Sequence, residues 1–562
     1  MNFENINSLV ELYDFTKQNN LEKNFLFKIN KSKEIDSLTW GQVDQKVKNV
    51  TNFLQEKGIV KGDRILLVSE NRPEWLISDL AILKSGAITV PNYTTYTAKD
   101  FEFILNDCSP KGLIVSNEKL LDTIQKACTK INYQLKFIIL FDKEKSTSGI
   151  IHFLDIPNTN INYNCTIKRT DPACIIYTSG TQGTPKGVLL SHGGILANVE
   201  GAYELIKEIK ISKFRFLTWL PLSHSYEHTV QFVQISLSAE IFYCANLEKL
   251  IETIKISKPH VMTAVPRFYN NLYNKMKPKL NESRIFAKTV ELGSKSFLGQ
   301  NLSIFDRMLN KILNYLVRKK VVKNFGGNLK AFISGGGPLD KNIGIFLNSV
   351  GLRTLQGYGL TEFSPVVSCN PINKIKIETV GIPFKKIKVK INDDGEIIVQ
   401  GESLMMKYWN NEKATNEAIK NGWLYTGDIG EIDEDGYLKI TDRKKDIIVN
   451  SGGDNISPAK IENLLCINPE IEQAFIYGDN KNYLVALIVL NKEFNLSRAE
   501  IEKIVDKVNK GLTAIEKIKN FSVLKEAFTI DNNMLTPTMK IKRHVIKNHF
   551  LEILNAFYSS KN

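Results

Sequence analysis

The sequence predicts an α/β protein with a large N-terminal domain and a small C-terminal domain. A chain of 562 residues is too long for one hydrophobic core, so several domains or subdomains are expected. Strand-like and helix-like runs alternate up to about residue 370, which is typical of layered α/β subdomains. We expect an N-terminal domain over 1–442, with a β-rich subdomain at about 379–442 where Gly and Asp turns separate short strands, and an α+β domain over 443–562.

Short apolar runs predict the buried strands of the first subdomain. Such runs occupy 64–69, 112–116 and 136–141, and a helical pattern at 75–83 lies between the first two. A further apolar run at 173–177 predicts another buried strand. This alternation favours strands that are covered by helices.

A loop rich in glycine and hydroxyl residues follows the strand at 173–177. Glycine lets the backbone adopt positive φ angles and approach a ligand closely, while N–H groups, hydroxyls and a lysine can surround phosphate oxygens. The spacing is not that of a Walker A motif, and the structural alternative is a polar surface loop. We predict a phosphate loop formed by Thr178, Ser179, Gly180, Thr181, Gln182, Gly183, Thr184, Lys186 and Gly187.

Two later motifs carry groups suited to a nucleotide. In residues 356–363 (QGYGLTEF), the ring of Tyr358 can stack on a base, and Glu362 is a carboxylate of the kind that holds Mg²⁺ beside phosphates. In residues 425–428 (YTGD), Asp428 can accept hydrogen bonds from two ribose hydroxyls. Taken singly, each motif also fits a turn or a helix cap.

The composition is ordinary for a soluble enzyme, with 43% hydrophobic and 24% charged residues. No apolar run is long enough to span a bilayer, and no secretory signal is evident. Seven cysteines without a Cys-x-x-Cys pair predict reduced thiols, a cytoplasmic location and no zinc site. The net charge of +14 comes without a nucleic-acid-binding motif, so no nucleic-acid partner is expected.

In this order and spacing, the motifs resemble those of the adenylate-forming (acyl-activating, AMP-binding) enzyme superfamily. The phosphate loop and the two nucleotide motifs are followed by the charged run 442–446 (DRKKD) and by 535–540 (LTPTMK), so the resemblance covers nearly the whole chain. One departure is Gln182, where most members of the superfamily have threonine. It leaves the glycines and the lysine of the loop in place.

Three further features are similar to long-chain fatty acyl-CoA synthetases. They are residues 219–228 (WLPLSHSYEH), residues 264–273 (AVPRFYNNLY) and a long basic helical insertion before residues 333–339 (ISGGGPL). The resemblance therefore implies an acid–thiol ligase that uses ATP, Mg²⁺ and coenzyme A. A fatty acid would be converted to an acyl-adenylate and pyrophosphate, and the thiol of coenzyme A would then displace AMP.

The resemblance also implies roles for individual residues. Lys540 would bridge the carboxylate and the α-phosphate, His224 would lie between the adenylate and the acyl pocket, and Glu362 with Thr178 would hold Mg²⁺. Between the two half-reactions the C-terminal domain would rotate as a mobile lid, with Lys445 at the hinge. The implied nucleotide-binding set adds to the phosphate loop Gly335, Gly336, Gly337, Tyr358, Gly359, Thr361, Asp428 and Arg443.

The insertion contains an amphipathic helical pattern at 305–320. Its apolar face comprises Phe305, Met308, Leu309, Ile312, Leu313 and Leu316. Positive charge is supplied by Arg307, Lys311, Arg318, Lys319 and Lys320. Such a helix fits the anionic inner face of a membrane and predicts peripheral association there. The alternative is a helix that packs only on its own domain.

Other functions stay open at this stage. A medium-chain or aryl acid is compatible with the same motifs, and so is an inactive membrane-associated lipid-binding relative, although the retained Glu362, Asp428, Arg443 and Lys540 argue against it. An amino-acid adenylation domain is disfavoured because residues 223–226 lack an aspartate for the substrate amine. The sequence does not indicate the acyl chain length or the oligomeric state.

Overall fold

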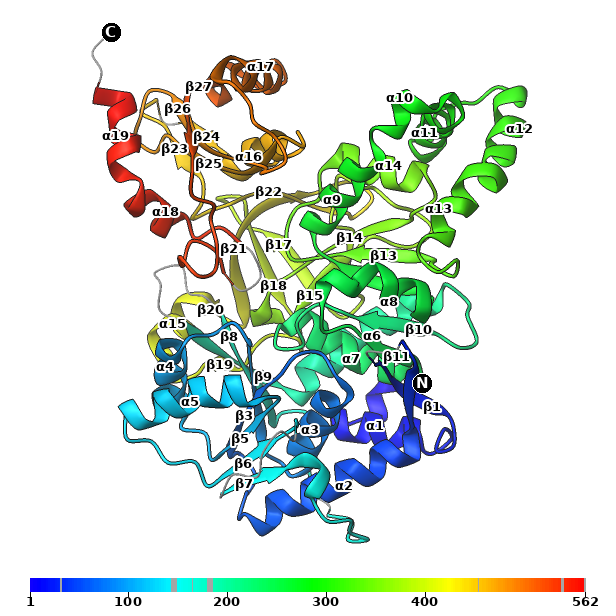
Figure 1. Ribbon diagram of the computed structural model, residues 1–562, viewed down its shortest axis with the longest axis vertical. Helices are drawn as coiled ribbons and strands as arrows, with labels where there is room; N and C mark the ends of the chain where they lie inside the picture. Colours follow the sequence, from blue (N-terminus) through cyan, green and yellow to red (C-terminus); the bar gives the residue numbers. More distant parts are fainter. Residues whose placement is uncertain are drawn as a thin grey trace.

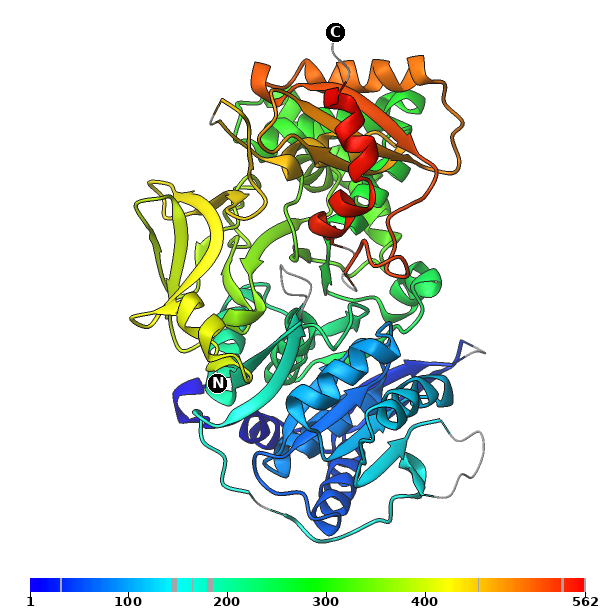
Figure 2. The ribbon, with the colours of Figure 1, turned by 90° about the vertical axis from the view of Figure 1, so that its left-hand side faces the viewer.

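The structure is a computed structural model. It describes residues 1–30, 33–142, 149–163, 165–178, 185–452, 454–536 and 540–559. The chain folds as an α/β protein with a large N-terminal domain, a β-rich subdomain and a small C-terminal domain, which confirms the predicted fold class (Figures 1 and 2). Figure 2 shows the C-terminal domain at the top and the first α/β layer at the bottom.

The first layer is an eight-stranded sheet in the order β19-β9-β8-β4-β3-β5-β6-β7. Strands β4 to β7 run parallel, and the pair β8–β9 is antiparallel. The bounds are β3 (Arg64–Val68), β4 (Ile88–Asn92), β5 (Gly112–Val115), β6 (Phe137–Leu140), β7 (Ile150–His152), β8 (Pro172–Thr178), β9 (Lys186–Ser191) and β19 (Lys407–Tyr408). The four apolar runs recognised in the sequence are therefore β3, β5, β6 and β8.

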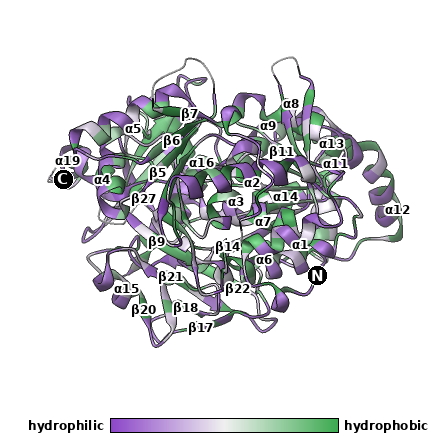
Figure 3. Cartoon of the chain, turned by 90° about the horizontal axis from the view of Figure 1, so that it is seen from below, coloured by the Kyte–Doolittle hydropathy of each residue, from purple (hydrophilic) through white to green (hydrophobic). Residues whose placement is uncertain are grey.

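Helices cover this sheet, and their ends follow from local sequence. Helix α2 (Trp40–Glu56) begins at a capping box of Thr39 and Gln42, and α4 (Ala98–Cys108) begins at one of Thr97 and Asp100. Helix α3 (Pro73–Lys84) has proline at its first position and is buried on every side, which explains its weak amphipathic pattern. Helix α5 (Glu118–Lys130) completes the cover. Figure 3 shows that strands β5, β6 and β7 are predominantly hydrophobic.

The second layer is a nine-stranded sheet in the order β16-β15-β14-β13-β12-β10-β11-β1-β2. Its strands are β1 (Asn24–Ile29), β2 (Ile35–Thr39), β10 (Arg215–Thr218), β11 (Glu240–Tyr243), β12 (Val261–Ala264), β13 (Ala331–Ser334), β14 (Thr354–Gly359), β15 (Val366–Cys369) and β16 (Ile382–Pro383). The helices of this part are α1 (Leu9–Lys17), α6 (His192–Lys207), α7 (Ser225–Ser236), α8 (Leu250–Ser257), α9 (Pro266–Met276), α10 (Lys279–Glu282), α11 (Arg284–Phe297), α12 (Ile304–Leu313), α13 (Lys319–Lys323) and α14 (Lys341–Ser349).

The β-rich subdomain contains a five-stranded sheet and α15 (Glu412–Ala418). Its strands are β17 (Lys388–Ile391), β18 (Glu396–Gln400), β20 (Ile419–Lys420), β21 (Trp423–Ile432) and β22 (Leu438–Arg443). Antiparallel pairing aligns Asp428 of β21 with Arg443 of β22, so two predicted site residues become neighbours.

The C-terminal domain has a three-stranded sheet with apolar cores on both faces. Its elements are β23 (Ile448–Val449), β24 (Asn455–Ile456), α16 (Pro458–Cys466), β25 (Ile471–Tyr477), β26 (Leu484–Leu490), α17 (Arg498–Asn509), β27 (Ile518–Leu524), α18 (Arg543–His549) and α19 (Leu551–Ser559). All seven cysteines of the chain lie in the described part and are unpaired. Each helix in the described ranges is too short or too polar to cross a bilayer.

Candidate functional site

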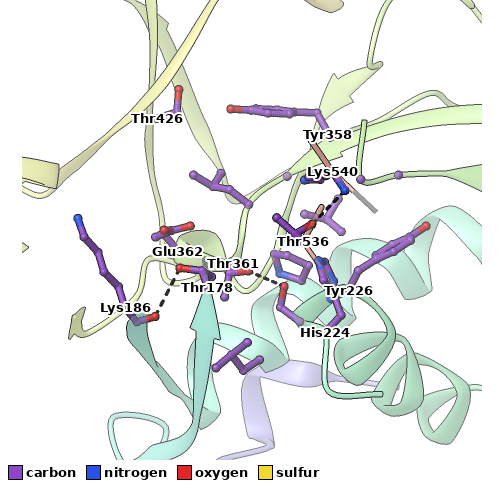
Figure 4. Close-up of a pocket in the computed structure, with 18 of the residues that line it drawn as sticks. Thr178, Lys186, His224, Tyr226, Tyr358, Thr361, Glu362, Thr426, Thr536 and Lys540 are labelled. Carbon is purple, nitrogen blue, oxygen red and sulfur yellow. Dashed lines mark hydrogen bonds between the residues drawn. The ribbon is translucent and has the colours of Figure 1, made fainter. Parts of the chain in front are cut away.

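A cavity of about 1510 Å³ lies where the two large sheets, the β-rich subdomain and the C-terminal domain meet. Its walls come from the ends of β8 and β9, from helices α6 and α7, from strands β12 to β14, and from the segment that contains Lys540. Figure 4 shows Thr178, Lys186 and Glu362 on one side, and His224, Tyr226 and Lys540 on the other. Motifs that are hundreds of residues apart in sequence therefore face one space.

One end of the cavity is formed by the hairpin of β8 and β9. Thr178 ends β8 directly opposite Lys186, which begins β9, and the Thr178 hydroxyl donates to the carbonyl of Lys186 over 3.4 Å. Both residues line the cavity. The remaining loop residues of the prediction, Ser179, Gly180, Thr181, Gln182, Gly183 and Thr184, lie outside the described residues.

Glu362 lies beside this hairpin, in a short 3-10 turn after β14 (Figure 4). Its Oε1 accepts a hydrogen bond of 2.9 Å from the hydroxyl of Tyr408, and the ring of Tyr408 lies 4.8 Å from the Lys186 ammonium. Sequence reasoning missed Tyr408. Tyr408 reaches Glu362 because strand β19 pairs with β9, a long-range contact that no local sequence motif predicts.

The predicted nucleoside residues lie on a neighbouring wall. Tyr358 lines the cavity, and its hydroxyl donates to Asp428 Oδ2 at 2.6 Å, while Arg443 Nε donates to Asp428 Oδ1 at 2.9 Å. Asp428 is 3% exposed. Its charge raises the pKa of Arg443, and burial raises the pKa of Tyr358 well above its usual value. Each carboxylate oxygen keeps capacity for a second hydrogen bond.

Glycines at two places allow close backbone approach on this wall. Gly335 and Gly336 line the cavity, and Gly337 follows in the same bend. A Cβ at Gly335 would lie 3.1 Å from the ring of Tyr226, and Gly336 has φ +81°. A Cβ at Gly359 would lie 2.1 Å from the carbonyl oxygen of Pro365, so only glycine fits there. Thr361 also lines the cavity, and its hydroxyl is 3.0 Å from that of Ser225.

His224 caps the N-terminus of α7 and also lines the cavity. Its Nδ1 accepts the backbone N–H of Tyr226 at 3.2 Å, which places the proton of the neutral ring on Nε2. Burial, with repulsion from Lys540, lowers the pKa of His224 to about 3. The imidazole is therefore neutral near pH 7 and offers an N–H donor.

The other ionisable residues of the 219–228 motif stabilise the fold beneath the site. His228 Nε2 lies 2.9 Å from Asp79 Oδ2, and both side chains are buried. Glu227 accepts a hydrogen bond from Thr263 at 2.7 Å, and burial raises its pKa to about 8. These groups hold α7 against α3 and β12, and they orient the end that carries His224.

Lys540 reaches the cavity from the C-terminal domain. Its backbone N–H donates to the Thr536 hydroxyl at 3.0 Å, and the Thr536 N–H donates to the Lys540 carbonyl at 2.8 Å. Withdrawal from bulk water lowers the pKa of Lys540 to about 8, and repulsion from Arg443 adds to the shift. Lys445 lies in the turn after β22 and also lines the cavity.

A further part of the cavity is apolar. Its lining comes from α6, α7, neighbouring strands and a loop, and comprises Ala202, Leu205, Ile206, Phe216, Val230, Val233, Val261, Ile333 and Phe384. Gly201 makes room for the ring of Phe384, because a Cβ there would lie 2.3 Å from it. Sequence reasoning missed this lining, since helix periodicity marks apolar faces without separating core contacts from cavity walls.

The described residues hold no cluster of three or more His, Cys, Asp or Glu side chains suited to a metal ion. Glu362 is the carboxylate that lines the cavity beside Thr178. One carboxylate fits Mg²⁺ that takes its other ligands from phosphates and water, whereas a metal held by protein alone would need more.

Comparisons with known proteins agree on one family. Residues 15–409 match the AMP-binding enzyme family, and residues 445–562 match the AMP-binding enzyme C-terminal domain. The chain is 32% identical over 539 residues to long-chain-fatty-acid–CoA ligase FadD15 of Mycobacterium tuberculosis, covering 90% of this chain and 89% of that protein. It is 29% identical to long chain acyl-CoA synthetase 3 of Arabidopsis thaliana, with 92% and 86% covered.

Solved structures support the fold. The anthranilate CoA ligase AuaEII in complex with anthranoyl-AMP is similar with a TM-score of 0.78 at 21% identity, covering 99% of this chain and all of that one. ATP-bound MatB from Rhodopseudomonas palustris is similar with a TM-score of 0.74 at 20% identity, covering 98% of this chain and all of that one.

Proposed function

The chain belongs to the AMP-binding enzyme family, and from that premise we propose that it is an ATP-dependent long-chain fatty acid–CoA ligase. The observation that carries the proposal is the two-part cavity. One part presents Lys186, Glu362 and Lys540, whereas the other is lined by aliphatic and aromatic side chains. A fatty acid needs both environments, because its carboxylate must meet ATP while its chain leaves water.

In the first half-reaction, a carboxylate oxygen of the fatty acid bonds to the α-phosphorus of ATP and pyrophosphate leaves. Lys540 offsets the repulsion between the two anions, and the Nε2–H of neutral His224 donates to an oxygen at the reacting centre. Tyr358 stacks on the adenine, Asp428 and Arg443 bind the ribose, and the phosphate loop holds the phosphates.

Glu362, supported by Tyr408, and the hydroxyl of Thr178 would hold Mg²⁺. The ion supplies positive charge beside the phosphates. The chain itself contributes the orientation of the Glu362 carboxylate, because Tyr408 occupies one of its oxygens and the Met405 N–H donates to the Glu362 carbonyl at 2.9 Å.

In the second half-reaction, the sulfur of coenzyme A bonds to the acyl carbon, AMP leaves, and the thiol proton passes to solvent. Lys540 occupies the cavity in the arrangement described above, so we propose that the C-terminal domain rotates about Lys445 before the thiol enters. The C-terminal domain has apolar cores of its own on both faces of its sheet, and this supports its movement as a unit.

A panel of acids of graded chain length tests this proposal, with ATP and coenzyme A present and thioester formation as the readout. The highest kcat/KM should occur with palmitate or stearate. A preference for butyrate or anthranilate would overturn the long-chain assignment and favour a ligase for another acid. Fatty acid binding without turnover of any acid would indicate an inactive lipid-binding relative.

A further inference from the structure

The basic insertion forms an arm at the edge of the molecule. Helix α11 packs on α14, and α12 continues through a π-helical turn (Asn314–Arg318) into α13. Figure 1 shows α12 at the outer end of this arm, away from the C-terminal domain. None of the residues 279–323 lines the catalytic cavity.

Arg318 anchors the arm, which corrects the sequence-based prediction that it supplies surface charge. It is 8% exposed, and its guanidinium donates to the carbonyls of Ser349, Asn310 and Thr289 at 2.7, 3.0 and 3.1 Å. Gly293 leaves the space it needs, because a Cβ there would lie 2.8 Å from Nη2. This anchoring fixes which face of the helix points outward.

The outward face is apolar. Leu313 packs inward at 4% exposed, and Leu309 is half-buried, so these two leave the apolar face predicted from sequence. The side chains that remain exposed are Ile304 (80%), Phe305 (74%), Met308 (62%), Ile312 (52%), Tyr315 (66%) and Leu316 (50%). A contiguous stripe of this kind on a soluble domain marks an interaction surface, whereas scattered apolar residues would not.

Positive charge is concentrated in the segment of the chain that carries this stripe, although Arg318 is buried within it. Residues 275–325 contain twelve Lys and Arg and three Asp and Glu, a net charge of +9 out of +14 for the whole chain. One of the three acids, Glu291, is already paired with Lys288 and Lys295 at 3.0 and 2.8 Å. Arg307 and Lys311 are exposed and lie along one edge of the stripe, by the 100° rotation per helical residue.

We propose that the stripe on α12 and the π-turn docks the protein on an anionic lipid bilayer. Apolar side chains would enter the interface between headgroups and acyl chains, and the flanking cations would face the lipid phosphates. The charge complementarity favours this occupant over a protein, because lysine is depleted in protein–protein interfaces. The proposal does not depend on which acid the cavity accepts.

Sedimentation of the full-length protein with phosphatidylglycerol/phosphatidylcholine vesicles tests the proposal. One variant replaces Phe305, Met308 and Ile312 with serine, and a second replaces Arg307, Lys311 and Lys320 with glutamate. The matched control replaces Lys119, Lys126 and Lys136, exposed residues of the first layer, with glutamate and so changes the net charge equally. Circular dichroism checks the fold of each variant.

The wild type should bind these vesicles, more strongly at low salt. Both arm variants should bind the vesicles at least roughly tenfold more weakly than the wild type. The control should stay within about twofold of the wild type. Equal weakening by the control would overturn the proposal, because overall charge would then explain the binding. Unchanged binding of both arm variants would overturn it as well. A third outcome would also overturn the proposal: the wild type does not bind vesicles and is a dimer, and the serine variant is a monomer. The stripe would then join two copies of the chain.

Discussion

Replacing Lys540 with arginine should alter how kcat/KM for the adenylation half-reaction falls at alkaline pH. Withdrawal from bulk water lowers the pKa of Lys540 to about 8. With that pKa, roughly nine-tenths of the enzyme carries the ammonium charge at pH 7 and roughly one-tenth at pH 9. In the proposed mechanism, the charged form is the one that offsets repulsion between carboxylate and phosphate. The kcat/KM of the wild type for adenylation should therefore fall about tenfold between these two pH values.

ATP–pyrophosphate exchange with palmitate, in the absence of coenzyme A, measures the adenylation half alone. The Lys540→Arg variant should be slower than the wild type at pH 7 but nearly flat up to pH 9, because a guanidinium stays charged. Thioester formation from preformed palmitoyl-adenylate and coenzyme A is the control. This half should proceed even in Lys540→Ala, since no carboxylate approaches a phosphate in it.

Two outcomes would refute this reasoning. The same alkaline limb in Lys540→Arg and in the wild type would assign the titration to another group. Equal loss of both half-reactions in Lys540→Ala would show that the lysine does not act on adenylation in particular. No acid limb near neutral pH is expected from His224, because burial lowers its pKa to about 3.

Substitutions at four further residues probe separate parts of the structure. Glu362→Gln should lower Mg²⁺–ATP turnover roughly a hundredfold with little change in the melting temperature of the unliganded protein, since its carboxylate faces the cavity. Tyr408→Phe removes the hydroxyl that donates to Glu362, so the Mg²⁺ concentration for half-maximal exchange should rise roughly tenfold while saturating Mg²⁺ restores the rate. Arg318→Ala leaves buried carbonyls unpaired and should lower the free energy of unfolding by about 2–4 kcal/mol in urea titrations. Lys445→Pro should slow the thioester half-reaction, measured with preformed adenylate, more than the adenylation half-reaction, measured by ATP–pyrophosphate exchange. Lys445→Ala should keep the rates of both half-reactions.

The elements of the fold could be predicted where the signal is local. The apolar run at 64–68 becomes the central strand β3 because it is buried on both faces and needs no partner information to be recognised. Pairing between distant strands could not be predicted. Strand β1, near the N-terminus, lies beside β11, more than 200 residues later, and belongs to the second sheet. Such pairing depends on how whole layers pack.

The same division applies to the site. The motif at 356–363 marked Tyr358 and Glu362 by their side-chain chemistry, whereas Gly336 was implied only by the resemblance to the adenylate-forming superfamily; all three residues line the cavity. Tyr408 carries no such signal, since only the pairing of β19 with β9 brings it to Glu362. Arg318 shows the opposite error: its charge suggested the surface, yet three backbone carbonyls make a buried position favourable.

The position of the proposed hinge follows from the contacts just before it. Arg443 binds Asp428, and Lys444 binds Asp394 and Glu396 at 2.6 and 2.9 Å, so both residues are fastened to the β-rich sheet. We therefore propose that rotation takes place after Lys444, at Lys445, where a change of φ and ψ leaves these ion pairs intact. The same arrangement explains why one domain movement could serve both half-reactions. In the proposed movement, Arg443 would stay with the ribose site while Lys540, carried by the rotating domain, would leave the cavity.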